Sequence, residues 1–503
     1  MKLSRSPSWL VLVLALLFPL RSPAATFVVT KTADTSDGSC NADCSLREAI
    51  LAANAGGSTV QIPAGVYRLT IPRSPRGDNA AGDGTNGNLV VNSAMTVIGA
   101  GRNATIIDAR PSAAGVGIDR VFSITQAGNL TISGVTIRGG RTSGFGQGGG
   151  ILSLGGSVSI TDSAVLHNAG LFGGGGIAIS SASNPAGVLT ITRCEIAENV
   201  GGLAIGGGQG GGILNIQSTV TIFDSTIRDN TALNTTGGGI MNIDNQSRPS
   251  PPAALSVIRS TIVGNVAGDP ARTSINEGVG GGIYNNGGRL VLTNSTVTGN
   301  EAIPSFAQGF GSLPGTGRGG GVAHQMLLGD DPNDGTSIVN STIAYNVAFT
   351  GSQLYGSDTV SALRVANTLV ARDASVAGNC ASPSTQIGIE SFGGNLSSDA
   401  SPCFFDDPRD QVAVAPGLAT LLADNGGPTE TIALLAGSSA IGAARQESCP
   451  SLDQRGVTRK EACDVGAYET VPEAGAALGG IAAAAALVML HRKRRSTQVT
   501  HRP

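Results

Sequence analysis

Carboxylates gathered in loops are the residues of this sequence best suited to chemistry. They fall into three loops, one with Asp330, Asp331 and Asp334, one with Asp406 and Asp407, and one with Asp78 and Asp83. Two such groups at a suitable separation act as acid and base on a glycosidic bond, and oxygen clusters also bind calcium. Solvated acidic turns are a third interpretation, and no loop completes the spacing of an EF-hand. We therefore predict no catalytic residue, no metal ligand and no cofactor.

Other features of the composition also disfavour a site that cleaves polysaccharides. The only tryptophan is Trp9, near the N-terminus, and aromatic residues make up 4% of the 503 residues. Residues 1–24 hold three basic side chains, and residues 471–503 hold five basic and one acidic side chain. The remaining 24 basic and 34 acidic side chains give residues 25–470 a net charge of −10. A surface this acidic repels nucleic acid and anionic lipid, so neither is expected as a partner.

The seven cysteines form three close pairs and one single residue. The pairs are Cys40 with Cys44, Cys380 with Cys403, and Cys449 with Cys463, and the single residue is Cys194. In an exported protein such pairs form disulfides. Zinc is the alternative, but it needs tight Cys/His clusters, and residues 25–470 contain only His167 and His324.

The elements that would position these residues are repeats. A nine-residue unit with an aliphatic first and sixth residue, a small fourth residue and a final Asn begins at Ile160, Ile191, Ile222, Val257, Leu292 and Ile338, and it fades in a seventh copy that begins at Val365 and ends in Asp373. A glycine triplet followed by Ile or Val precedes the first six units and ends at Ile151, Ile177, Ile213, Ile240, Ile283 and Val322. β-Branched columns bounded by Gly and Asn are typical of strands and turns.

Stacking these repeats predicts an all-β fold, a right-handed parallel β-helix (solenoid), over residues 121–375. One repeat cannot bury its own apolar face, and the uneven period suits a solenoid better than a propeller. Glycine supplies 74 of 503 residues, which disfavours a helical protein. We expect the repeated Asn to adopt the left-handed backbone of a corner. Cys194 occupies the small fourth position, so we expect a buried, unreactive thiol.

Both ends of the chain are typical of targeting segments. Residues 1–24 combine a basic start, a short apolar run and small residues, which indicates a signal peptide; an uncleaved anchor is the alternative. Residues 471–503 contain Pro472 and Glu473, then an apolar run and a basic cluster. This arrangement resembles the carboxy-terminal sorting signals of PEP-CTERM type in Gram-negative bacteria, although Ala474 departs from the usual Pro. The resemblance implies a sorting protease or transpeptidase as partner; a retained membrane anchor is the alternative.

The segment from Cys40 to Ile50 predicts the N-terminal cap. Ser45 and Glu48 form the capping box of a helix that should run to about Asn54. Such a helix covers the open end of a solenoid. The segment resembles the CSLREA signature letter for letter through Ala49. We assign residues 25–120 to this cap and the first coils.

Residues 376–470 resemble the choice-of-anchor Q family of bacterial surface proteins. The resemblance is carried by residues 424–429, 453–456 and 463–469, with Gly442 where that family usually has Asp. Together with the resemblance of residues 471–503 to a sorting signal, it implies an exported protein at the cell surface or outer membrane of a Gram-negative bacterium, or one released from it. Membrane contact would occur only through the C-terminal segment. The resemblance brings no catalytic residue.

Loop lengths indicate where a partner would bind. Extra residues enter at alternate coils near residues 184–185, 248–252 and 327–334, so these loops should project from one side. Residues 301–318 form another long loop, with Phe306 and Phe310 as candidate anchors beside Asp330 and Asp331. We expect an adhesive or structural protein that binds a cell-surface or matrix polysaccharide or protein. A carbohydrate-active β-helix enzyme, a lyase or glycoside hydrolase, is the alternative.

Overall fold

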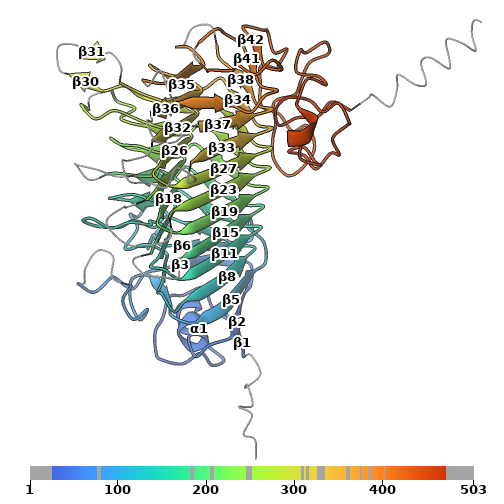
Figure 1. The fold of residues 1–503 in the computed structure, drawn as a ribbon. Coiled ribbons are helices and arrows are strands. Elements are labelled where there is room, and N and C mark those ends of the chain that lie inside the picture. Colours follow the sequence, from blue (N-terminus) through green and yellow to red (C-terminus); the bar gives the residue numbers. More distant parts are fainter. Residues whose placement is uncertain are drawn as a thin grey trace, which may run out of the picture.

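The chain winds into a right-handed parallel β-helix, which confirms the predicted fold class (Figure 1). The computed structural model describes residues 25–75, 81–181, 186–203, 209–244, 252–272, 274–307, 311–312, 316–325, 335–357, 363–373, 377–383, 388–401 and 403–471. Three long parallel sheets run along the rod, and a full coil contributes one strand to each. We name them sheets A, B and C.

The strands of each sheet follow one another from coil to coil. Sheet A contains β1 (Thr26–Val28), β2 (Ser58–Ile62), β5 (Ala94–Gly99), β8 (Asn129–Ser133), β11 (Ser157–Thr161), β15 (Val188–Thr192), β19 (Thr219–Phe223), β23 (Ala254–Ile258), β27 (Arg289–Thr293), β33 (Thr336–Val339), β37 (Leu363–Ala366) and β40 (Ile389–Ser391). Sheet B contains β3 (Gly65–Arg68), β6 (Thr105–Asp108), β9 (Thr136–Arg138), β12 (Ala164–Leu166), β16 (Glu195–Ala197), β20 (Thr226–Arg228), β24 (Thr261–Val263), β28 (Thr296–Thr298), β34 (Thr342–Ala344), β38 (Leu369–Ala371), β41 (Leu396–Ser397) and β42 (Gln411–Val412).

The third long sheet and two small ones complete the coils. Sheet C contains β4 (Leu89–Val91), β7 (Phe122–Ile124), β10 (Ile151–Ser153), β14 (Ile177–Ser180), β18 (Ile213–Ile216), β22 (Ile240–Ile243), β26 (Ile283–Asn286), β32 (Val322–Gln325), β36 (Leu354–Ser357) and β39 (Cys380–Ala381). Sheet D contains β13 (Ala169–Gly170), β17 (Val200–Gly201), β21 (Thr231–Ala232), β25 (Val266–Ala267), β29 (Glu301–Ala302) and β35 (Val347–Ala348). The hairpin β30 (Phe306–Ala307) and β31 (Gly311–Ser312) lies outside them.

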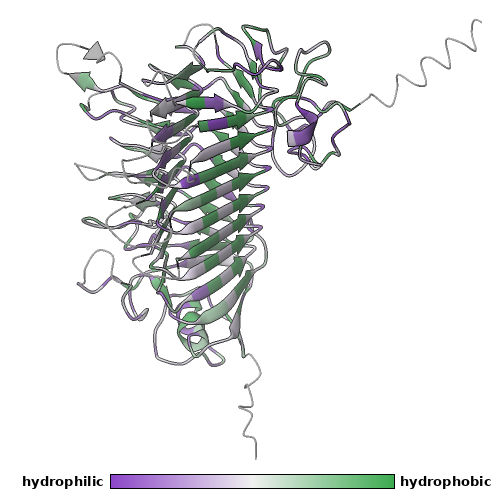
Figure 2. Cartoon of the chain, in the orientation of Figure 1, coloured by the Kyte–Doolittle hydropathy of each residue, from purple (hydrophilic) through white to green (hydrophobic). Residues whose placement is uncertain are grey.

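The nine-residue unit forms the corner between sheets A and B together with the strand in sheet B. Its first residue stacks in sheet A, where Ile191 lies between Ile160 and Ile222. Its sixth residue stacks in sheet B, where Ile196 is the central example. These isoleucines are fully buried, and Figure 2 shows hydrophobic segments recurring at the same place on successive strands. Burying one such side chain stabilises the fold by about 1.5–3 kcal/mol.

The fourth residue of each unit is buried in the corner and hydrogen-bonded to its neighbours. The Ser225 hydroxyl donates to the Phe223 carbonyl at 2.6 Å and accepts the Cys194 amide at 3.0 Å. The same pattern continues through Ser260 and Ser295. Cys194 occupies this column and is 3% exposed, as expected for a small buried residue.

The Asn at position nine builds a ladder of side-chain hydrogen bonds along the rod. Asn199 Nδ2 donates to Asn230 Oδ1 at 2.9 Å, and Asn230 Nδ2 donates to Asn265 Oδ1 at 2.9 Å. The expectation that this Asn has left-handed backbone is wrong. That conformation belongs to the preceding residue, such as Glu198 at φ 55° or Asp229 at φ 52°. The Asn is selected because its amide both donates and accepts inside the turn.

Helix α1 (Leu46–Ala53) covers the N-terminal end of the rod. Ser45 caps it and Glu48 completes the capping box, as predicted. The Arg47 guanidinium is buried and donates to Asp34 at 2.7 Å and to the Gly87 carbonyl at 2.8 Å. These bonds tie the helix to the first coils.

Strands β40, β41 and β42 continue the coils beyond residue 375. Residues 413–471 then form a C-terminal lobe that packs on the side of the rod (Figure 1, red). The lobe contains the short 3₁₀ helix η1 (Gln446–Ser448). Within the described residues, no helix is long and apolar enough to cross a membrane.

Three disulfides have the expected pairing. They join Cys40 to Cys44, Cys380 to Cys403 and Cys449 to Cys463. The first lies beside the N-terminal helix, the second closes a late coil, and the third crosses the lobe. Cys194 remains a free, buried thiol.

Candidate functional site

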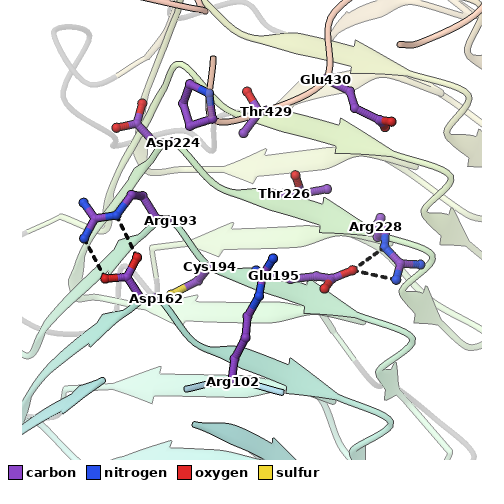
Figure 3. A pocket seen from close by; sticks show the side chains of 11 residues that line it. Arg102, Asp162, Arg193, Cys194, Glu195, Asp224, Thr226, Arg228, Thr429 and Glu430 are labelled. Atoms are coloured by element: carbon purple, nitrogen blue, oxygen red, sulfur yellow. Dashed lines mark hydrogen bonds and ion pairs between the residues drawn. The ribbon is translucent and has the colours of Figure 1, made fainter. Parts of the chain in front are cut away.

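A polar cleft of about 600 Å³ lies where the C-terminal lobe meets the rod. One wall is the corner between sheets A and B together with the outer side of sheet B, and the other is the lobe segment 428–430 (Figure 3). The lining residues are Arg102, Asp162, Arg193, Cys194, Glu195, Asp224, Thr226, Arg228, Pro428, Thr429 and Glu430. The cleft therefore combines charged residues from separate coils with residues at least 200 positions away in the chain.

The third position of the repeat supplies the charged column of the cleft. Asp162, Arg193, Asp224 and Arg259 occupy this position on consecutive coils, each with left-handed backbone that turns the side chain outward. Arg193 Nε donates to Asp162 at 2.7 Å, and Arg259 Nε donates to Asp224 at 2.8 Å. Acidic and basic groups thus alternate from coil to coil along the corner.

The outward residues of sheet B form the floor. Glu195 on β16 accepts from Arg228 on β20 at 2.6 Å, and Thr226 lies on the same strand as Arg228. Thr226 is the equivalent, one coil earlier, of Thr261, whose hydroxyl donates to the Glu430 carbonyl at 2.6 Å. The lobe therefore contacts the coil of Thr261 but not the preceding coil of Thr226. The cleft is the space left between the lobe and this preceding coil.

Two charged side chains of the cleft have no ion pair with a described residue. Arg102 is exposed, and in Figure 3 its side chain runs from its turn toward Cys194 and Glu195. Glu430 lies on the lobe wall and is also exposed. A ligand in the cleft would meet one available cation and one available carboxylate on opposite walls.

Two residues of the cleft, Asp162 and Cys194, are poorly suited to catalysis. The hydrogen bond from Arg193 lowers the pKa of the Asp162 carboxyl below its usual value, so this group stays ionised at neutral pH. A glycosidase acid needs the opposite, a raised pKa. Burial raises the pKa of the Cys194 thiol to about 11, so the sulfur is not a nucleophile.

The structure places the predicted site residues only in part. Phe306 is half-buried in β30 beneath the Arg272 guanidinium, which lies 5.6 Å from its ring centroid. Phe310, Asp330 and Asp331 lie outside the described residues, as do Pro472 and Glu473.

The other predicted acidic loops are turns where the structure describes them. Asp83 accepts from the Thr85 amide and Asp407 accepts from the Arg409 amide, each at 2.9 Å. Among the described residues no group of three or more His, Cys, Asp or Glu side chains could hold a metal ion. The strands that flank the three long loops, β14, β22 and β32, stack in sheet C two coils apart.

A second polar cluster lies on the outer side of sheet C and was not predicted. The Arg318 guanidinium lies 5.3 Å from the Tyr355 ring centroid, donates to its hydroxyl at 3.1 Å and pairs with Glu277. The Tyr284 hydroxyl donates to Gln325 at 2.6 Å, and burial raises the pKa of Tyr284. These residues come from separate coils, so the sequence contains no local signal for them.

Comparisons with known proteins agree with the fold. A family model described as a right handed beta helix region matches residues 117–325. No curated protein sequence matches the chain.

Similar solved structures share the β-helix at low sequence identity. Pectate lyase Pel9A is 19% identical with a TM-score of 0.48, and the match covers 90% of this chain and 97% of that one. The A-module of the Azotobacter vinelandii mannuronan C-5 epimerase AlgE4 is 14% identical with a TM-score of 0.38, covering 73% and 93%. A GH87 α-1,3-glucanase from Streptomyces thermodiastaticus strain HF3-3 is 16% identical with a TM-score of 0.30, covering 74% and 69%. The activities in these names belong to those proteins.

Proposed function

We propose that the protein is an exported surface protein whose β-helix has an adhesive or structural role. In this proposal residues 1–24 direct export, and a sorting enzyme acts near Pro472 and Glu473. The three disulfides support the proposal because disulfides persist in oxidising compartments. The long loops at 301–318 and 327–334 would meet a cell-surface or matrix partner.

The observation that carries the proposal is that the residues that resemble the two surface-protein families bond to one another inside the fold. In the CSLREA-like segment, Arg47 pairs with Asp34 and Glu48 accepts from the Ser45 amide, all inside the fold. In the segment that resembles choice-of-anchor Q proteins, Arg459 donates to Glu469 at 3.2 Å, and both are buried. Polar groups that complete each other in this way build the N-terminal cap and the C-terminal lobe, so the residues that carry the resemblance serve the fold.

Surface display and adhesion test the proposal together. The full-length chain, expressed in a Gram-negative host, should become accessible to antibody on intact cells and should increase adhesion to a matrix surface. Shortening the 301–318 loop or the 327–334 loop should reduce adhesion while circular dichroism stays unchanged. Surface material should lack peptides beyond about Ala474 if sorting occurs. Unchanged adhesion in both folded loop variants would contradict the adhesive role.

The polar cleft supports a second candidate, a carbohydrate-active enzyme. Its lining of paired arginines and carboxylates offers many groups for sugar hydroxyls, and Glu430 is a carboxylate without an ion pair among the described residues. A screen on acidic and neutral polysaccharides tests this candidate. Loss of a detected cleavage activity in Glu430→Gln, or in Asp330→Asn or Asp331→Asn, would favour the enzyme over the adhesin.

A further inference from the structure

Eight hydroxyl side chains stand in one unbroken column on the outer side of sheet A. Strand pairing aligns them from β1 to β23 as Thr26, Thr59, Thr96, Thr131, Ser159, Thr190, Thr221 and Ser256. With strands about 4.8 Å apart, the column is about 34 Å long. These residues lie 28 to 37 positions apart in the chain, so only the register of the coils brings them into line.

The hydroxyls of this column are available to a ligand. None of the eight forms a hydrogen bond with another described residue, and each side chain is exposed or half-buried. The buried serines of the corner differ, since the Ser225 and Ser260 hydroxyls both bond to backbone carbonyls. The outer column is therefore not used to hold the coils together.

The surroundings of the column on β5 to β23 are regular and uncharged. From β5 to β23 two further columns flank it, and neither contains Asp, Glu, Lys or Arg. The flanking residues are Ala94, Asn129, Ser157, Val188, Thr219 and Ala254 on one side, and Ile98, Ser133, Thr161, Thr192, Phe223 and Ile258 on the other. The neighbouring corner, in contrast, has alternating acidic and basic groups such as Asp162 and Arg193. We call the three columns on β5–β23 the hydroxyl face; Figure 1 shows these strands side by side at the front of the rod.

A neutral hydroxyl array binds weakly to ordinary soluble ligands. Exchanging a hydrogen bond to water for one to a ligand gains only about 0.5–1.5 kcal/mol. The column gains affinity only if one rigid partner bonds to the hydroxyls of many strands at once. The face contains one aromatic side chain, Phe223, so ring stacking on sugars is not its means of binding.

We propose that the hydroxyl face adsorbs to ice, that is, to an ordered lattice of water. With water as the ligand every hydroxyl stays hydrogen-bonded, so contact leaves none of these polar groups unsatisfied. Threonine is stiff at χ1, so its methyl and hydroxyl repeat at the strand spacing with little loss of entropy on binding. Charged groups would hold their own hydration shells, and this face has none. The uniform spacing of the coils matches a periodic partner better than a molecule of finite size.

Adsorption to single ice crystals tests the inference on the purified, fluorescently labelled protein. The unmodified protein should coat a growing crystal and lower its growth temperature. Thr190→Tyr and Thr221→Tyr, which place a large ring in the centre of the face, should abolish both effects. Thr458→Tyr, at an exposed threonine of the lobe, should leave both unchanged. Unchanged melting temperatures by circular dichroism would show that all three variants fold.

Each remaining outcome overturns the inference. The inference is rejected if ice excludes the unmodified protein, or if both tyrosine variants adsorb to ice as well as the unmodified protein does. It is also rejected if the unmodified protein is retained on crystalline cellulose or chitin but does not adsorb to ice. The inference does not depend on the proposed function. Failure on ice with intact cell adhesion rejects the ice-binding face alone, and the reverse result rejects the adhesin alone.

Discussion

At the residue scale, the asparagine ladder contributes both cohesion and uniqueness to the stack. Asn230 Nδ2 donates to the Ile196 carbonyl and to Asn265 Oδ1, each at 2.9 Å. Its own Oδ1 accepts from the Asn199 amide and side chain. Each buried rung is therefore fully paired only when the coils are in register.

Replacing one rung should be costly because several buried groups lose their partners together. We expect Asn230→Ala to lower the free energy of unfolding by about 2–4 kcal/mol, since it leaves buried donors of Asn199 unsatisfied. Urea unfolding followed by circular dichroism measures the change. Asn129→Ala, on the exposed side of sheet A, should change it by less than about 0.5 kcal/mol. Similar losses in both variants would argue against the ladder.

Glu48 makes the N-terminal cap sensitive to acid. Burial opposes ionisation of this carboxyl, but hydrogen bonds from the Ser45 amide, the Thr35 hydroxyl and the Asp37 amide outweigh it. They lower the pKa of Glu48 from 4.5 to about 2. Because the folded pKa is the lower one, the stabilisation is complete above pH 4.5 and is lost as the pH falls toward 2.

The acid sensitivity can be measured as stability against pH. Between pH 4.5 and pH 2 the cap should lose roughly 3 kcal/mol of stability in the unmodified protein. Glu48→Gln should be less stable at neutral pH and show a flatter profile over this interval. Glu461→Gln, at an exposed position of the lobe, should follow the unmodified profile. A Glu48→Gln profile parallel to the unmodified one would reject the assignment.

At the scale of elements, Gln454 is the centre of the contact between lobe and rod. Its side chain is fully buried, accepts from the Thr296 hydroxyl at 2.6 Å and donates to the Thr261 hydroxyl at 2.9 Å. Asn294 adds a bond to the Leu452 carbonyl at 2.7 Å. The outward residues of these late coils thus bind the lobe, whereas Thr226 and Glu195, the equivalents of Thr261 on the two preceding coils, line the cleft.

Removing the central amide should loosen the lobe without unfolding the rod. We expect Gln454→Leu to remove the hydrogen bonds that join the lobe to the Thr261 and Thr296 hydroxyls through this amide, and to expose Arg455 and Arg459 to trypsin. Limited proteolysis followed by mass spectrometry should show faster cleavage in the lobe, with the coils still resistant. Gln61→Leu, on the exposed side of sheet A, should digest like the unmodified protein. Equal lobe cleavage in both variants would contradict a clamping role for Gln454.

At the scale of the whole molecule, the rod should behave as a chain of coils that communicate only with their neighbours. Arg47→Ala leaves Asp34 buried without its cation, which should cost about 3–5 kcal/mol. Hydrogen exchange should quicken in β1, β2 and β4 but not in β24 and β28. Arg193→Ala, which removes an exposed pair, should cost less than about 1 kcal/mol. Faster exchange throughout the rod would show that the coils unfold as one unit.

The sequence by itself determined the β-helix, the helical cap and the disulfide pairing. The buried aliphatic positions and the glycine triplets recur in the sequence because each coil must meet the same steric demands. The capping box of Ser45 and Glu48 is a local pattern of four residues. The prediction of a left-handed backbone at the repeated Asn was wrong, because this residue is selected for its side-chain hydrogen bond to the next coil. Such contacts leave no signature in a single repeat.

Only the tertiary structure decided where surfaces form. The hydroxyl face exists because the register of the strands aligns Thr131 with Ser159 and Thr190. The sequence of a single strand does not show which outward residues will lie side by side. The cleft exists because the lobe folds back on Thr261, more than 150 residues before Gln454. Contacts over such separations depend on the number of coils and on the shape of the loops, and local physical chemistry determines neither.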